Sequence, residues 1–216
     1  MRPRVTLKLA TSLDGRIATA AGESQWITGE TARAEGHRLR ASHDAILIGV
    51  GTAIADDPLL TVRQPGLEDR QPVRIVMDSR QRLDPGSKLV RSAHESPVIV
   101  VTVQLPSPAL IRAGVEVLQV HAGRDGRVSL NHALTALRAK GVVSLLVEGG
   151  GDVAASFLRG DVVDRIEWFR APILLGSEGR PGVGSLAAEE LGQARRFRRL
   201  AAEPCGDDLW ERYERL

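Results

Sequence analysis

The chain has 216 residues, 43% of them hydrophobic and 26% charged, and its 29 basic residues nearly balance 27 acidic ones. A chain of this length and composition buries enough surface to fold without disulfides or metal, so we expect a single domain over residues 1–216. Only seven residues are aromatic. This scarcity argues against nucleic-acid binding, in which bases stack on aromatic side chains.

The single cysteine, Cys205, excludes a disulfide within the chain and agrees with a reducing compartment. No apolar run approaches the roughly 18 residues of a membrane span, and no apolar segment near the start is typical of a signal peptide. The five histidines form no H-E-x-x-H motif, and one cysteine cannot make a C-x-x-C zinc site. We therefore expect a cytoplasmic protein that binds neither membrane nor metal.

Short, β-branched apolar runs recur along the chain and predict strands. They are Val5–Ala10, Ala45–Val50, Val73–Met77, Pro97–Val103, Val115–Val120 and Val142–Val147. Several are nearly continuous rather than alternating, which is typical of strands buried on both faces of a mainly parallel sheet. Because aromatic residues are almost absent before Phe157, the core of this part must be aliphatic.

Helical patterns lie between these runs. They cover Gly29–Ser42 with Thr28 as a possible N-cap, Ser129–Lys140 with leucines at helical spacing, and Asp152–Arg159. Strands alternating with helices indicate an α/β fold with a layered sheet.

The last quarter of the chain has a different character. A strand over Asp164–Ile173 enters a loop rich in Gly and Pro, Leu175–Gly184, and Phe197–Ala201 with Asp208–Tyr213 predict a terminal antiparallel pair. Six of the seven aromatic residues lie at or after Phe157, five of them in this part. We therefore expect it to pack at a sheet edge or a subunit contact.

The segment Ser144–Ser156 (SLLVEGGGDVAAS) is the most distinctive local feature. A buried strand leads into Glu148, three glycines and a helix start. Glycine lets a backbone approach a ligand closely or adopt positive φ, and a helix N-terminus attracts anions. The segment thus predicts either a phosphate cradle or a plain tight turn. Glu148, at the carboxyl end of the strand, is either a ligand contact or a solvated charge.

A second candidate segment is Gly49–Arg63 (GVGTAIADDPLLTVR). We expect a short helical turn that Thr52 opens and that Asp56, Asp57 and Pro58 close, because proline forces the preceding residue out of helical conformation. Asp56 is a possible ligand or acid–base group, and Asp57 a possible cap. Paired acids before proline are commonly only turn formers.

Two residues stand out from their surroundings. Lys8 lies in a strand that otherwise has core composition, so it either snorkels to an edge or is held for chemistry. Trp26, in the polar loop Gly22–Thr28, either closes over a bound ring or plugs the loop.

Taken together, these segments resemble one family. K-L-A-T-S-L-D-G-R-I-A, G-E-S-Q-W-I-T, D-D-P-x-L-T-V-R, R-I-V-M-D-S and V-E-G-G-G occur in the order found in the riboflavin-biosynthesis pyrimidine reductases, the reductase domain of the bifunctional deaminase-reductase. The resemblance runs from Lys8 to Ile173. The chain has no H-x-E or P-C-x-x-C deaminase signature, so the resemblance implies a stand-alone reductase.

The resemblance implies a dihydrofolate-reductase-like fold, with three α/β/α layers, a mainly parallel mixed sheet and a C-terminal antiparallel edge. It implies NADPH as hydride donor and a phosphorylated pyrimidine as substrate. The ribosylamino group of 5-amino-6-(5-phosphoribosylamino)uracil would be reduced to a ribitylamino group at C1′ of the ring-opened sugar imine. It also implies a homodimer.

Site residues follow from the resemblance position by position. Those matching cofactor contacts are Ala10, Trp26, Thr52, Asp56, Ser79 near the adenosine end, and the pyrophosphate-binding run Gly150, Gly151, Asp152, Val153, Ala154, Ala155 and Ser156. Those matching substrate contacts are Ser24, Arg40, Leu60, Arg63 and Glu148. The predicted catalytic residues are Lys8, Asp56 and Glu148. Arg40 and Arg63 suit the substrate phosphate, because a guanidinium fork matches phosphate oxygens.

Two alternatives remain. One is a pteridine or dihydrofolate-type reductase with the same fold, against which the predicted phosphate pair Arg40 and Arg63 argues. The other is an NADPH-binding module without turnover. Such a module would not need Lys8, Asp56 and Glu148 together.

Overall fold

The computed structural model describes all 216 residues. Its contacts cluster into two compact units. Unit 1 comprises Met1–Arg4 and His37–Leu146, and unit 2 comprises Val5–Gly36 and Val147–Leu216. The single domain over residues 1–216 stays a prediction. No helix in either unit has the length and apolar character needed to cross a membrane.

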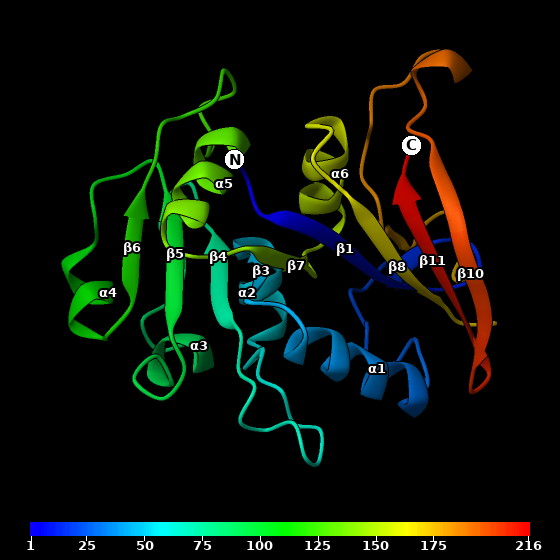
Figure 1. Ribbon diagram of the computed structural model, residues 1–216, viewed down its shortest axis with the longest axis horizontal. Helices are drawn as coiled ribbons and strands as arrows, with labels where there is room; N and C mark the ends of the chain where they lie inside the picture. Colours follow the sequence, from blue (N-terminus) through cyan, green and yellow to red (C-terminus); the bar gives the residue numbers. More distant parts are fainter. The chain divides into compact units, whose positions relative to one another are not determined.

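Unit 1 is built on parallel strands (Figure 1). Their spatial order is β7 (Ser144–Val147), β3 (Ala45–Gly49), β4 (Val73–Met77), β5 (Val98–Thr102) and β6 (Glu116–Gln119). β3 pairs with β4, β4 with β5 and β5 with β6, all in parallel. Every residue of β3 and β5 is buried, as expected for strands covered on both faces. All five strands coincide with predicted apolar runs.

The helices of unit 1 are short. They are α2 (Val50–Asp56), α3 (Lys88–Arg91), α4 (Pro108–Arg112) and α5 (Leu130–Ala139). α5 confirms the predicted helix there. α2 begins at Val50 rather than at Thr52, because Gly49 is the last extended residue before it. The main cluster of buried residues in this unit is wholly aliphatic, as its composition predicts.

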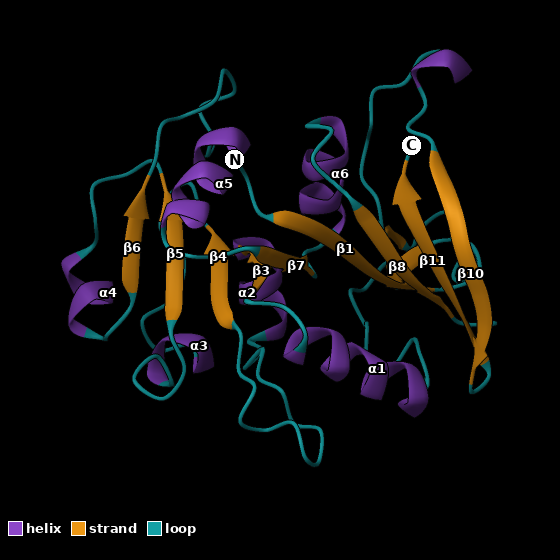
Figure 2. Ribbon diagram, viewed as in Figure 1, coloured by secondary structure: helices purple, strands orange, loops and turns teal.

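Unit 2 contains a mixed group of strands whose order is β10 (Phe197–Cys205), β11 (Asp208–Arg215), β8 (Arg165–Arg170) and β1 (Arg4–Thr11). β1 pairs with β8 in parallel, whereas β8 with β11 and β11 with β10 are antiparallel (Figure 2). The terminal hairpin confirms the predicted antiparallel pair, and both strands run further than predicted. With the parallel strands of unit 1, this edge confirms the predicted fold class.

Two helices and a small strand pair complete unit 2. The helices are α1 (Glu30–Ala41) and α6 (Gly151–Arg159), and the last turn of α1 belongs to unit 1. The strand β2 (Arg16–Ala18) pairs with β9 (Arg180–Pro181). A 3-10 turn covers Leu191–Gln193. α1 begins at Glu30, so Gly29 and not Thr28 immediately precedes it. Thr28 is buried, and its carbonyl accepts a hydrogen bond from the Arg33 guanidinium (2.8 Å).

Candidate active site

Lys8 lies on β1 with its side chain half-buried, and Ala10 lies on the same face two residues later. The Lys8 ammonium is 5.8 Å from the centroid of the Phe169 ring on β8. On α1, a Cβ built at Gly36 would lie 3.9 Å from this ammonium. Helix α1 therefore passes close to the lysine at a position without a side chain. Lys8 is held between a ring and a helix rather than extended from a free edge.

The glycine triplet connects β7 to α6, as predicted, but its glycines act differently. None of Gly149, Gly150 and Gly151 has positive φ. A Cβ on Gly151 would collide with the carbonyl oxygen of Pro181, and the Gly184 N–H donates to the Gly151 carbonyl (2.9 Å). Glycine at 151 is therefore required by close packing of the chain's own loop, which corrects the expectation of positive φ.

The predicted pyrophosphate run is only partly accessible. Ala154 and Ala155 are 0% and 1% exposed, so their side chains belong to the core and cannot contact a cofactor. Asp152 is exposed, and Val153 and Ser156 are half-buried. Gly150, the cap residue of α6, has no side chain of its own to cap the helix N-terminus. Glu148, between β7 and α6, is half-buried.

Trp26 lies on the surface of unit 2 with 67% of its area exposed, so it fills no core. The guanidinium carbon of Arg33 is 4.6 Å from the centroid of its ring, a cation–π contact. Ser24, in the same loop, is half-buried. The loop thus presents an exposed indole supported by a cation, a surface on which a flat ring can pack.

In unit 1, the structure separates the two acids at the end of α2. Asp57 caps the helix in left-handed conformation (φ 39°), and its carboxylate accepts the Lys88 N–H (2.8 Å). Asp57 is therefore the turn residue of the pair. Asp56 is the last residue of α2 and is exposed, and Thr52, one turn earlier, is half-buried.

The loop after α2 is fixed by a residue that the sequence did not single out. Arg74 of β4 is 0% exposed. It donates to the carbonyl of Leu59 (2.9 Å), to the hydroxyl and carbonyl of Ser92 (2.8 and 3.0 Å) and to the Ser96 carbonyl. Burial lowers the pKa of its guanidinium. The signal was present in the sequence, since Arg74 is a cation within an apolar run just as Lys8 is.

The same loop carries Leu60 and Arg63. Leu60 is 5% exposed with φ 56°, so its side chain is core rather than open surface. Arg63 is exposed, and its N–H donates to His37 (3.2 Å). Arg40 donates to the carbonyl of Thr61 (3.3 Å). The structure thus brings Arg40 to the loop that holds Arg63, as a shared phosphate contact requires.

Ser79 follows β4, at the edge where the parallel strands of unit 1 end. Its hydroxyl accepts the Val128 N–H (3.0 Å), which ties it to the loop between β6 and α5. Ligands in α/β folds bind at the carboxyl ends of parallel strands. Ser79 is therefore in a position suited to ligand contact.

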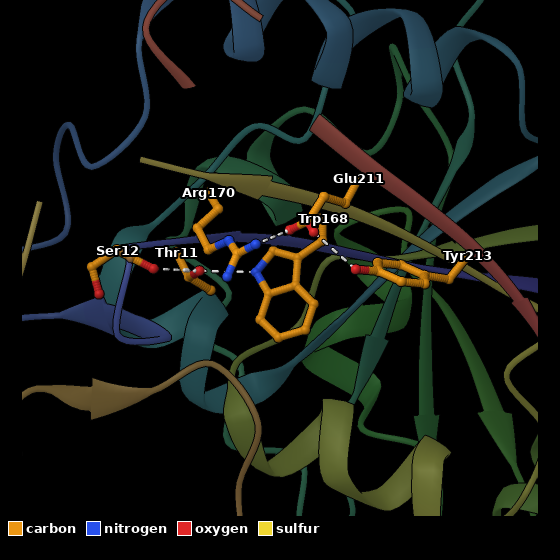
Figure 3. Close-up of polar contacts among 6 residues, drawn as sticks. All are labelled: Thr11, Ser12, Trp168, Arg170, Glu211 and Tyr213. Atoms are coloured by element: carbon orange, nitrogen blue, oxygen red, sulfur yellow. Dashed lines mark hydrogen bonds and ion pairs between the residues drawn. The ribbon is translucent and has the colours of Figure 1, made fainter. Parts of the chain in front are cut away.

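The face of β1 opposite Lys8 carries a polar network (Figure 3). The Trp168 indole donates to the Thr11 hydroxyl (2.9 Å), while Arg170 (2.6 Å) and the Tyr213 hydroxyl (2.9 Å) both bind Glu211. Burial and the neighbouring Glu211 carboxylate raise the pKa of Tyr213. These late aromatic residues pack within unit 2, so their predicted structural role is confirmed, whereas a role in dimerisation stays a prediction.

Over residues 3–210, the chain matches the family model described as the RibD C-terminal domain. It is 38% identical over 212 residues to the riboflavin biosynthesis protein RibD of Actinobacillus pleuropneumoniae, a match that covers 96% of this chain and 56% of that protein. The chain thus spans little more than half the length of this relative.

Two further relatives cover the whole chain or nearly so. The 2,5-diamino-6-ribosylamino-4(3H)-pyrimidinone 5′-phosphate reductase of Methanothermobacter thermautotrophicus is 34% identical over 215 residues, which are 99% of this chain and 98% of that protein. The structure of Acinetobacter baumannii RibD (form 2) superposes with a TM-score of 0.88 at 31% identity, covering 100% of this chain and 58% of that one. The chain belongs to the RibD C-terminal domain family.

Proposed function

We propose that this protein is an NADPH-dependent reductase of riboflavin biosynthesis. It reduces the ribosylamino side chain of 5-amino-6-(5-phosphoribosylamino)uracil to a ribitylamino side chain, and the whole chain acts as one reductase domain. The observation that carries this proposal is the near end-to-end match with an archaeal protein named as a pyrimidine reductase. The half-buried Lys8, held between Phe169 and α1, supports it from the geometry.

A second candidate substrate is the 2,5-diamino-6-ribosylamino-4(3H)-pyrimidinone 5′-phosphate that names the archaeal relative. It carries an amino group where the uracil carries a carbonyl. The residue that we assign to anchor the pyrimidine ring is Glu148. A carboxylate accepts hydrogen bonds from ring N–H or amino groups, so it suits either ring.

The residues present fit a nicotinamide dinucleotide. Gly150 brings no capping side chain of its own to the N-terminus of α6, and backbone N–H groups at such a terminus bind phosphate oxygens. In unit 2, the other accessible residues that we assign to the cofactor are Asp152, Ser156 and the exposed Trp26. We also assign Ala10, Thr52 and Ser79 to cofactor contact. When bound, NADPH supplies the hydride, and the protein supplies orientation and proton management.

The catalytic roles divide among three charged residues. We assign Lys8 and Asp56 to proton transfer during opening of the sugar ring and its reduction, and Glu148 to orientation of the pyrimidine. Arg40 and Arg63 hold the substrate phosphate, with Arg40 already bonded to the loop that carries Arg63.

The test mixes purified protein and NADPH with each pyrimidine in turn and follows NADPH absorbance. We expect oxidation with one or both pyrimidines and none with dihydrofolate. Oxidation with dihydrofolate alone would favour the pteridine-type alternative. Binding of NADPH without oxidation by any of the three would favour a non-catalytic module.

The homodimer that the family resemblance implies belongs to the same proposal. Its support is β10, a nine-residue edge strand of unit 2 with mostly exposed residues, since long exposed edges invite pairing with another chain. Light scattering at micromolar concentration should give twice the mass of 23.3 kDa. A monomer mass would contradict this part of the proposal.

A further inference from the structure

Two histidines lie beside each other at the carboxyl end of the strands of unit 1. His121 follows β6, and His132 lies in the first turn of α5. Their ring centroids are 4.8 Å apart with planes at 58°, and both residues are exposed. The Ser129 N–H donates to the His121 carbonyl (3.0 Å), and the Ser129 hydroxyl lies 3.0 Å from Nδ1 of His132. Ser129 thus holds both histidines in register.

His121 belongs to the same loop as the partner of Ser79, and His132 lies in α5, which directly follows that loop. This loop, His121–Ser129, rises beyond β6 and leads into α5 (Figure 1). It is closed by a bridge between Ala122 and Val128, and the Val128 N–H donates to the Ser79 hydroxyl. Ser79 is the residue that the family resemblance assigns to the adenosine end of the cofactor. The histidines are therefore fixed to the segment that would meet that end.

The loop His121–Ser129 and the segment after β4 that is bonded to it carry an excess of positive charge. Arg80, Arg124 and Arg127 are exposed, and none of their guanidinium groups forms an ion pair. The nearby acids are both engaged. Asp78 is 0% exposed and accepts the N–H groups of Leu83 (2.8 Å) and Arg80 (3.4 Å). Asp125 accepts the Arg127 N–H (3.1 Å).

Such a cluster suits a phosphate monoester. Imidazole N–H groups and guanidinium groups donate hydrogen bonds to phosphate oxygens, so two adjacent rings beside exposed arginines suit a doubly charged anion. NADPH differs from NADH only by a phosphate monoester on the adenosine ribose. The second ionisation of such a phosphate lies near pH 6, so it is close to dianionic at neutral pH.

We propose that His121 and His132, together with Arg80, bind the 2′-phosphate of NADPH and set the preference for NADPH over NADH. This inference rests on the proposed function, because it assumes that a nicotinamide dinucleotide binds with its adenosine end at Ser79. It adds to that function the residues that distinguish the two dinucleotides.

The test compares wild type with a His121→Asn, His132→Asn double variant by calorimetric titration of NADPH, NADH and 2′,5′-ADP. We expect the double variant to bind NADPH and 2′,5′-ADP about tenfold more weakly, as for loss of a charge-assisted contact, with NADH binding unchanged.

His94→Asn is the matched control. His94 is also an exposed histidine of unit 1, but it precedes β5 and so lies toward the amino ends of the strands, opposite to the carboxyl ends where His121 lies. This variant should bind both dinucleotides as wild type does. Equal losses of NADPH and NADH affinity in the double variant, or an unchanged preference, would overturn the inference. If wild type binds neither dinucleotide, the proposed function itself fails and the inference fails with it.

Discussion

β4 of unit 1 and β1 of unit 2 each carry one cation in an otherwise apolar strand, and the two cations differ in how they are accommodated. Arg74 is completely buried, and its guanidinium binds backbone carbonyls and a serine. Lys8 is half-buried beside an aromatic ring and a glycine of α1. Only Lys8 is accessible to a ligand, so a catalytic role is proposed for Lys8 and a structural role for Arg74.

The largest expected effect is on catalysis by Lys8. Lys8→Met should lower turnover at least about 100-fold, since removal of a general acid or base typically costs that much. Its free energy of unfolding should stay within about 1 kcal/mol of wild type, because methionine preserves the packing of the stem. Turnover is measured by following NADPH oxidation, and the free energy of unfolding is measured by urea unfolding. Near-normal turnover would make Lys8 a structural residue like Arg74.

The Arg74→Met variant should show the opposite pattern, with its main effect on stability. The variant leaves the carbonyls of Leu59, Ser92 and Ser96 without their donor, so it should lose about 3 kcal/mol of unfolding free energy. Urea unfolding measures the loss. If the variant unfolds like wild type, the buried network contributes little and the contrast with Lys8 disappears.

Asp56 and Asp57 give the same contrast at adjacent positions. Asp56→Asn should lower turnover about tenfold or more while NADPH still binds. Asp57→Asn should leave turnover nearly unchanged and cost about 1 kcal/mol of stability, because the charged contact with Lys88 is weakened. NADPH oxidation and urea unfolding measure both effects. If Asp57→Asn lowered turnover and Asp56→Asn lowered only stability, Asp57 would be the catalytic residue and Asp56 the structural one.

The smallest effects concern two carboxylates of unit 2 with opposite pKa shifts. Burial raises the pKa of Glu167 despite the hydrogen bond from the Trp210 indole. Its ionised form is therefore destabilising, and Glu167→Gln should raise the melting temperature slightly at neutral pH. This gain should fade as the pH falls toward the unfolded value of 4.5. A lower melting temperature at neutral pH would show that the charge stabilises the strand pair.

For Asp14, the Ser12 hydroxyl, with help from the N–H groups of Leu175 and Gly176, lowers the pKa to about 2. Its ionised form stabilises the fold, a contribution that is complete above pH 3.8 and lost as the pH falls toward 2. Asp14→Asn should therefore lower the melting temperature slightly at pH 5 and above but not near pH 2. An equal loss at both pH values would exclude the charge as the cause.

Much of the fold was predictable, because nearly continuous β-branched runs mark doubly covered strands. The exceptions have physical causes. α3 and α4 are single turns, too short to show helical periodicity. β10 continues past the predicted end at Ala201 and through Pro204. Proline is tolerated there because β10 is an edge strand.

The candidate site was predictable in its motifs and less so in its packing. The sequence predicted the helix to start at Asp152, one residue after its observed start at Gly151, and it indicated the separate role of Asp57. It could not show that Gly151 is required by Pro181, because that contact joins segments distant in the chain. It could not show that Ala154 and Ala155 face the core, that Arg74 holds the loop after α2, or that His121 and His132 lie side by side.

The central claim is that this chain reduces a phosphoribosylamino pyrimidine. The most direct measurement is mass spectrometry of the product formed from each pyrimidine with NADPH deuterated at the transferable position. The account predicts a product heavier by one deuterium and one hydrogen, with the deuterium at C1′ of a ribityl chain. Unchanged pyrimidine, or deuterium found only in tetrahydrofolate when dihydrofolate is supplied, would contradict it.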